Sequence, residues 1–143
     1  MNDPRHYFVI DTLRNGTPVT IRAIRPEDKT RLVSAFKKLD RESVYTRFFQ
    51  YVRELTDQAL KRATEIDFDR EVALVVTTNL GDEEIIIGTG RYVVFAETDA
   101  GRSAEVAFIV EEDYQGLGIA SRIFRHLVQI GRQNNVSRFT ADV

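Results

Sequence analysis

Cysteine is missing from this sequence, and histidine occurs only twice, at His6 and His126. The lack of cysteine excludes disulfide bonds, a cysteine nucleophile and thiolate metal ligands. The two histidines are isolated in the chain, so a metal site built on histidine side chains is not expected. The sequence therefore predicts a protein without disulfides and without a bound metal.

Long apolar runs and an excess of positive charge are missing as well. No stretch approaches the ~20 apolar residues of a membrane helix, and residues 1–10 lack the basic start and apolar run of a signal peptide. The formal net charge is -2, whereas nucleic-acid binding normally needs a concentrated basic face. These absences predict a cytoplasmic protein whose partners are neither membranes nor nucleic acids.

The overall composition is that of a globular protein. Apolar residues make up 43% of the sequence and charged residues 29%, which is an ordinary balance for a soluble domain. A chain of 143 residues is long enough to bury one core. We therefore expect residues 1–143 to form a single domain.

The beginning of the chain predicts a β-hairpin followed by a helix. Residues 8–13 and 19–24 are β-rich, and Asn15-Gly16 between them accepts the positive φ of a tight turn. A helix is then expected to open at residues 26–28. Proline is tolerated in a first turn, and acidic groups favour the positive end of the helix dipole.

The middle of the chain predicts two short helices and then three strands. The helices begin after the expected N-caps Ser43 and Thr56. The strands span residues 72–78, 85–95 and 104–110, and their short connections are typical of an antiparallel meander. Two glycines interrupt the second of these strands, where they mark either a β-bulge or a close packing contact.

A helix over residues 118–133 and a strand over residues 136–143 complete the predicted fold. A strand–helix–strand unit of this kind places its two strands parallel. The sequence therefore predicts an α/β fold of the α+β type, with a mixed, mostly antiparallel sheet flanked by helices. The last helix carries one apolar stripe, which predicts the face that packs against the core. The stripe consists of Ile119, Ile123, Leu127 and Ile130.

The loop before this last helix has the sequence Gln115-Gly116-Leu117-Gly118-Ile119-Ala120. Backbone N–H groups in a glycine loop ahead of a helix can converge on phosphate oxygens, and the helix dipole adds to the attraction. The loop is not a P-loop, because no lysine follows its last glycine. It is not a Rossmann fingerprint either, because Ser121 stands where the third glycine should be. The alternative is a tight strand–helix connection that needs glycine only for its turn geometry.

This stretch resembles the Q/R-x-x-G-x-G/A pyrophosphate signature of the GNAT superfamily of N-acetyltransferases, and the element order from Val19 to Val143 resembles the GNAT acyl-CoA N-acyltransferase fold. Residues 43–49 and 104–107 look most like the acetyltransferase domain of bacterial protein lysine acetyltransferases. Against this pattern the chain is truncated after the fifth strand, so the single domain would be C-terminally incomplete. An exposed sheet edge would result. We expect a homodimer to cover that edge, which light scattering tests.

The resemblance implies an N-acetyltransferase that transfers the acetyl group of acetyl-CoA to an amine, with a protein lysine as the expected acceptor. A small-molecule amine acceptor and a non-catalytic acyl-CoA-binding regulatory module are the alternatives. The last two strands would splay apart to admit the cofactor, the strand would hold the pantetheine arm, and the loop would hold the pyrophosphate. The implied cofactor-binding residues are Phe108, Ile109, Val110, Gln115, Gly116, Leu117, Gly118, Ile119, Ala120 and Ser121.

Glu105 matches the glutamate of the protein lysine acetyltransferase group, and the resemblance implies that it is the general base. A protonated amine cannot attack a thioester, and a free lysine has a pKa near ~10.4, so the site must remove a proton. Strand alternation puts Glu105 on one face with Ala107 and Ile109. The alternative is a solvated glutamate at a strand end.

Overall fold

The structure is a computed structural model that describes residues 3–37 and 56–141. The described residues form one six-stranded sheet in which the strands follow one another in sequence order. All neighbouring strands are antiparallel except β5 and β6, which are parallel as predicted. The strands are β1 (Phe8–Thr12), β2 (Pro18–Ala23), β3 (Glu71–Leu80), β4 (Glu83–Thr98), β5 (Gly101–Val110) and β6 (Val136–Ala141). The predicted mixed, mostly antiparallel fold is confirmed.

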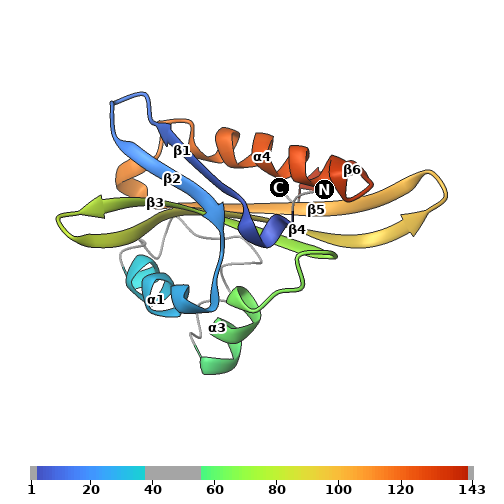
Figure 1. The fold of residues 1–143 in the computed structure, drawn as a ribbon, viewed down its shortest axis with the longest axis horizontal. Coiled ribbons are helices and arrows are strands. Elements are labelled where there is room, and N and C mark those ends of the chain that lie inside the picture. The colour runs from blue at the N-terminus through green and yellow to red at the C-terminus, as the bar shows by residue number, and fades with distance from the viewer. Residues whose placement is uncertain (1–2, 38–55, 142–143) are drawn as a thin grey trace.

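Helices cover both faces of this sheet (Figure 1). One face carries α1 (Lys29–Lys37) and α3 (Asp57–Thr64), and the other carries α4 (Ile119–Gln133). The 3₁₀ helices are η1 (Pro4–His6), η2 (Pro26–Asp28) and η3 (Glu112–Tyr114). Across residues 3–37 and 56–141, no helix has both the length and the apolar character needed to cross a membrane. The helix expected after Ser43 lies outside the described residues.

Local sequence signals place the ends of several elements correctly. Thr56 caps α3, and its hydroxyl accepts a hydrogen bond from the N–H of Ala59 at 3.0 Å. The predicted hairpin forms between β1 and β2, and Gly16 in its loop has a φ of 89°. Leu13, which was expected to belong to the first strand, instead begins the loop and is only 3% exposed. The strand ends one residue early because Leu13 enters the turn, where its N–H donates to the carbonyl of Thr17 and its carbonyl accepts from the N–H of Gly16.

The packing of α4 on β4 depends on the two glycines of β4. A Cβ atom on Gly90 would lie 2.3 Å from Cγ2 of Ile123, and one on Gly88 would lie 2.8 Å from Cγ2 of Ile119. The register between β3 and β4 also shifts beside Gly88. The glycines therefore serve both of the expected purposes, close packing and a bulge. The predicted stripe of α4 is buried at Ile119, Ile123, Leu127 and Ile130.

A buried ion pair joins β2 to η2, at the start of α1. Arg22 and Asp28 are 1% and 0% exposed, and their N–O contacts are 2.7 and 2.9 Å. Glu84 of β4 extends the network, because its carboxylate lies 3.3 Å from Nε of Arg22 and accepts a hydrogen bond from the Thr77 hydroxyl. Burial alone would raise the pKa of Asp28, but hydrogen bonds from Arg22 and from the N–H of Arg25 outweigh it and lower that pKa. The network fixes β2 and the β3–β4 hairpin relative to α1.

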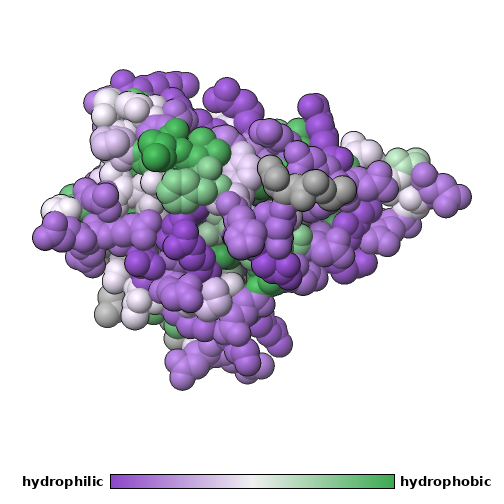
Figure 2. Space-filling view, in the orientation of Figure 1, coloured by the Kyte–Doolittle hydropathy of each residue, from purple (hydrophilic) through white to green (hydrophobic). Residues whose placement is uncertain are grey.

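The β1–β2 hairpin lies along α4 and is tied to it by two side-chain contacts. The Tyr7 hydroxyl is hydrogen-bonded to Nδ1 of His126, and Arg122 donates to the carboxylate of Asp11 at 2.5 Å. These contacts supply a partner for His126 that the sequence did not reveal. Figure 2 shows a largely hydrophilic face with an apolar cluster over β1 and β2. On β1, Phe8 and Ile10 are 55% and 75% exposed.

Candidate functional site

Among the residues that the structure describes, β6 pairs with only part of β5. β6 pairs with β5 only over residues 102–106, whereas the pairing with β4 continues to Val110. Residues 107–110 of β5 have no β6 partner among the residues that the structure describes. The described part of β6 ends at Ala141, so the expected splaying of the last two strands stays a prediction. β6 is the outer strand on this side of the described sheet, and its covering by a homodimer stays a prediction.

The backbone of β5 presents polar groups to the edge that faces away from β4. On the β4 side, the N–H of Glu111 donates to the carbonyl of Ile87 at 2.8 Å. Peptide groups alternate in direction along a strand, so those of Ile109 also face β4, and those of Phe108 and Val110 face the other edge. The side chain of Gln115 reaches the carbonyl of Val110 at 3.4 Å. The loop motif thus begins directly beside the strand edge.

Aromatic rings line the α4 side of this part of β5. Phe108 of β5 packs edge to face on Phe124 of α4, with ring centroids 6.0 Å apart. Phe124 packs in the same way on Phe139 of β6 at 5.9 Å, and Phe139 packs on Tyr92 at 5.8 Å. Phe124 keeps 38% of its surface exposed. These rings place an apolar wall next to the polar strand edge.

The glycine loop ends on the N-terminus of α4. Gly116 and Gly118 have φ angles of 81° and 80°, in the left-handed region that favours glycine. Gly118 is the N-cap, and no side chain caps the helix there. The first hydrogen bond of the helix runs from the N–H of Arg122 to the carbonyl of Gly118 at 3.1 Å. The N–H groups of residues 119–121 come before it and therefore have no partner within the helix. Such amides, together with the positive end of the helix dipole, are the groups by which a helix N-terminus can bind an anion.

Glu105 lies on the face of the sheet opposite α4. Its neighbours Ala104 and Val106 are buried, whereas Glu105 is exposed. Its register partners are Val93 of β4 and Thr140 of β6, so it stands one residue before the pairing with β6 ends. In the described part of the chain its carboxylate has no hydrogen bond or ion pair. Its carboxylate therefore lies unpaired, within the described residues, next to the last described β5–β6 pair.

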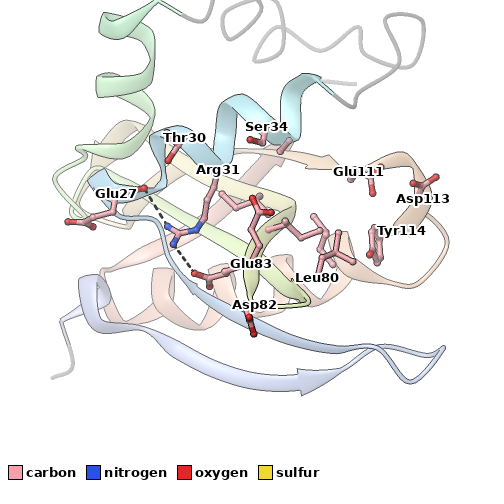
Figure 3. A pocket seen from close by; sticks show the side chains of 15 residues that line it. Glu27, Thr30, Arg31, Ser34, Leu80, Asp82, Glu83, Glu111, Asp113 and Tyr114 are labelled. Atoms are coloured by element: carbon pink, nitrogen blue, oxygen red, sulfur yellow. Dashed lines mark hydrogen bonds and ion pairs between the residues drawn. The ribbon is translucent and has the colours of Figure 1, made fainter.

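A cavity of about 450 Å³ lies on the same face as Glu105, beneath α1. Figure 3 shows Arg31 of α1 reaching across it towards the β3–β4 hairpin, where Arg31 pairs with Glu84 at 3.4 Å. Glu105 does not line this cavity. The lining residue nearest to it in sequence is Glu111, six residues away or about 20 Å along an extended strand. The acidic residues of the lining are Glu27, Asp82, Glu83, Glu84, Glu111 and Asp113.

The residues named from the sequence fall on one continuous path. Phe108, Ile109 and Val110 form the end of β5, and residues 115–121 form the loop and the first turn of α4. Glu105 lies at the strand end of this path. Among the described residues, no group of three His, Asp or Glu side chains has the arrangement of a metal site. The sequence did not reveal the aromatic wall, because its rings come from four separate elements.

Comparison with known sequences gives a consistent assignment. The profile of the Acetyltransferase (GNAT) family matches residues 38–143. An acetyltransferase from Pseudomonas aeruginosa is 29% identical over 125 residues, which cover 87% of this chain and 66% of that protein. The acetyltransferase Pat from Mycolicibacterium smegmatis is 33% identical over 132 residues, which cover 92% of this chain and 38% of Pat. The chain thus spans less than two thirds of either relative.

Solved structures share the same architecture. The GNAT domain of S. lividans PAT superposes with a TM-score of 0.80 at 33% identity, over 94% of this chain and 77% of that domain. A cAMP-binding acyltransferase from Mycobacterium smegmatis gives a TM-score of 0.61 at 30% identity, over 96% of this chain and 38% of that protein. Glucosamine-6-phosphate N-acetyltransferase from Arabidopsis thaliana is 16% identical with a TM-score of 0.63, and at that identity only the fold is shared.

Proposed function

The chain belongs to the GNAT acetyltransferase family, and from this premise we propose that it transfers the acetyl group of acetyl-CoA to the amine of a protein lysine. The observation that carries the proposal is the run from the end of β5 through the glycine loop to the uncapped N-terminus of α4. Coenzyme A has the matching order of groups, because an amide-bearing arm is followed by a diphosphate. No other described part of the chain combines these two features.

Each part of the path suits one part of the cofactor. The amides of the pantetheine arm pair with the peptide groups of Phe108 and Val110, as an added strand would. The aromatic wall around Phe124 covers the apolar side of the arm. The diphosphate lies on the N–H groups of residues 116–121, where the helix dipole favours negative charge. Gln115, at the start of the loop, lies between the strand that binds the pantetheine arm and the amides that bind the diphosphate.

The chemistry follows from the position of Glu105. The carboxylate removes a proton from the protonated amine, either directly or through a water molecule. The freed nitrogen attacks the thioester carbon, and an N–H of β5 stabilises the resulting oxyanion. The C–N bond forms first, and collapse of the tetrahedral intermediate then breaks the C–S bond. The nitrogen loses its second proton as it becomes the amide, and this proton passes to the departing thiolate. The exposed position of Glu105 leaves space for a lysine presented by a large partner.

Similarity supports a protein acceptor over a small amine. The relatives at 33% identity are named Pat and PAT, and residues 104–107 resemble the bacterial protein lysine acetyltransferases. A panel of protein and small-amine acceptors separates the two classes. Turnover of small amines only would contradict the protein acceptor, and binding of acetyl-CoA without any turnover would indicate a regulatory module.

A pair of glycine substitutions tests the phosphate site. We expect Gly116→Ala to weaken acetyl-CoA binding about tenfold in calorimetry, because the new methyl group blocks a charge-assisted hydrogen bond. Gly81→Ala is the matched control, because both glycines have a positive φ, 81° and 63°, and open space where a Cβ would lie. The two variants thus carry comparable backbone strain, of about 1 kcal/mol. Equal affinities of the two variants would contradict the loop as the phosphate site.

A further inference from the structure

Arg14, in the loop between β1 and β2, lies against the N-cap of α4. The position of a Cβ on Gly118 is 3.4 Å from Nη2 of Arg14 and 3.6 Å from its Cζ and Nε. The three similar distances mean that the guanidinium plane lies across Gly118. Figure 1 shows the tip of the β1–β2 hairpin beside the beginning of α4. Two segments about one hundred residues apart in sequence therefore meet at the proposed phosphate site.

The position of Arg14 is fixed by contacts on both sides of it. Within the loop, the N–H of Leu13 donates to the carbonyl of Thr17 at 2.9 Å, and the N–H of Gly16 donates to the carbonyl of Leu13 at 2.9 Å. The strand before the loop is tied to α4 through Asp11 and Arg122. The hairpin therefore holds the Arg14 backbone next to the first turn of α4.

The charge of Arg14 is not compensated by the protein. Its guanidinium is exposed and makes no hydrogen bond or ion pair with any residue that the structure describes. A cation at the N-terminus of a helix is unfavourable, because the helix dipole is positive there. Asp11, the nearest acidic residue in the hairpin, is already paired with Arg122. An anionic ligand between Arg14 and the amides of α4 would remove this repulsion.

We propose that Arg14 binds the diphosphate of the coenzyme beside Gly118, at the N-terminus of α4. This inference rests on the proposed function, because it takes the loop as the diphosphate site. The planar guanidinium offers two parallel N–H donors to phosphate oxygens, and such contacts are directional and charge-assisted. The N–H groups of residues 116–121 bind the diphosphate, and the Arg14 guanidinium, which lies against Gly118, contacts the same phosphate oxygens from the hairpin side. The β1–β2 hairpin is thereby part of the cofactor site.

Calorimetry on the whole chain with three ligands tests this role. The ligands are coenzyme A, dephospho-coenzyme A, which keeps the diphosphate but lacks the 3′-phosphate, and pantetheine, which lacks both. We expect Arg14→Ala to weaken the first two about tenfold, as loss of a charge-assisted contact does, and to leave pantetheine binding unchanged. Arg132→Ala is the control, because it removes an equal charge from an exposed position about 20 Å along α4.

A second measurement separates ligand binding from a structural role. Without ligand, the Tm of Arg14→Ala is expected to equal or exceed that of the wild type, because a cation leaves the helix N-terminus. Arg14→Lys is expected to give an intermediate loss of affinity, since lysine keeps the charge but lacks the two parallel N–H donors of the guanidinium. Unchanged affinity of Arg14→Ala, a loss confined to coenzyme A or an equal loss for pantetheine would overturn the role. Failure of the wild type to bind coenzyme A would instead refute the proposed function itself.

Discussion

Replacing Glu105 by glutamine is expected to lower kcat for acetyl transfer by at least ~100-fold, the lower end of the usual contribution of a general base. Glutamine has nearly the same shape but cannot take a proton from the amine. The affinity for acetyl-CoA should stay the same, because Glu105 faces away from the α4 side, where the aromatic wall and the loop lie. Steady-state turnover and calorimetry on the same variant measure the two effects separately.

Glu83→Gln supplies the matched control for this substitution. Glu83 is exposed at the start of β4, and its replacement should leave kcat unchanged. Equal turnover of Glu105→Gln and the wild type would remove Glu105 from the mechanism. A loss of acetyl-CoA affinity equal to the loss of turnover would show instead that the residue supports cofactor binding.

Substituting Asp28 is expected to have the largest effect on stability. Asp28→Ala leaves Arg22 fully buried without the partner that accepts two of its hydrogen bonds. Removing one member of a buried pair typically costs about 3–5 kcal/mol, a large part of the 5–15 kcal/mol that stabilises most domains. Urea unfolding of Asp28→Ala and of Asp99→Asn, an exposed turn position, measures the difference. A loss below about 1 kcal/mol would show that water reaches Arg22.

The same pair predicts how stability depends on pH. The Arg22 and Arg25 hydrogen bonds lower the pKa of Asp28 in the folded protein below the value of 3.8 expected for an unfolded chain. The stabilisation is therefore complete above pH 3.8 and is lost as the pH falls through the lower, folded value. The wild type should lose stability in this acidic window, whereas the Asp28→Ala variant lacks this contribution at every pH. Parallel pH profiles for the two proteins would contradict the assignment.

Much of the fold could be predicted because its signals are local. The stripe along α4, the cap at Thr56 and the alternation in β5 each depend on residues close together in sequence. The glycine loop was recognisable for the same reason, since a strand, the loop and the helix N-terminus are consecutive. The path proposed for the cofactor therefore follows from the sequence once the family pattern is seen.

The rest depends on contacts between distant segments, which no local pattern encodes. Charged residues are usually exposed, so no local pattern predicts that Arg22 and Asp28 are buried together. Phe124 is adjacent in sequence to Ile123 of the predicted α4 stripe, and only the tertiary structure shows that it joins β5 and β6 through ring contacts. No local sequence pattern predicts a role for Arg14 in its polar hairpin loop, because only the tertiary structure brings it next to Gly118.

A crystal structure of the chain with coenzyme A is the most direct test of the phosphate site. We expect the diphosphate oxygens to lie about 3 Å from backbone nitrogens of residues 116–121, which is hydrogen-bonding distance. We also expect the pantetheine arm to lie along β5 at Phe108 and Val110. A bound coenzyme whose diphosphate lies elsewhere, with the N-terminus of α4 left to solvent, would contradict this site.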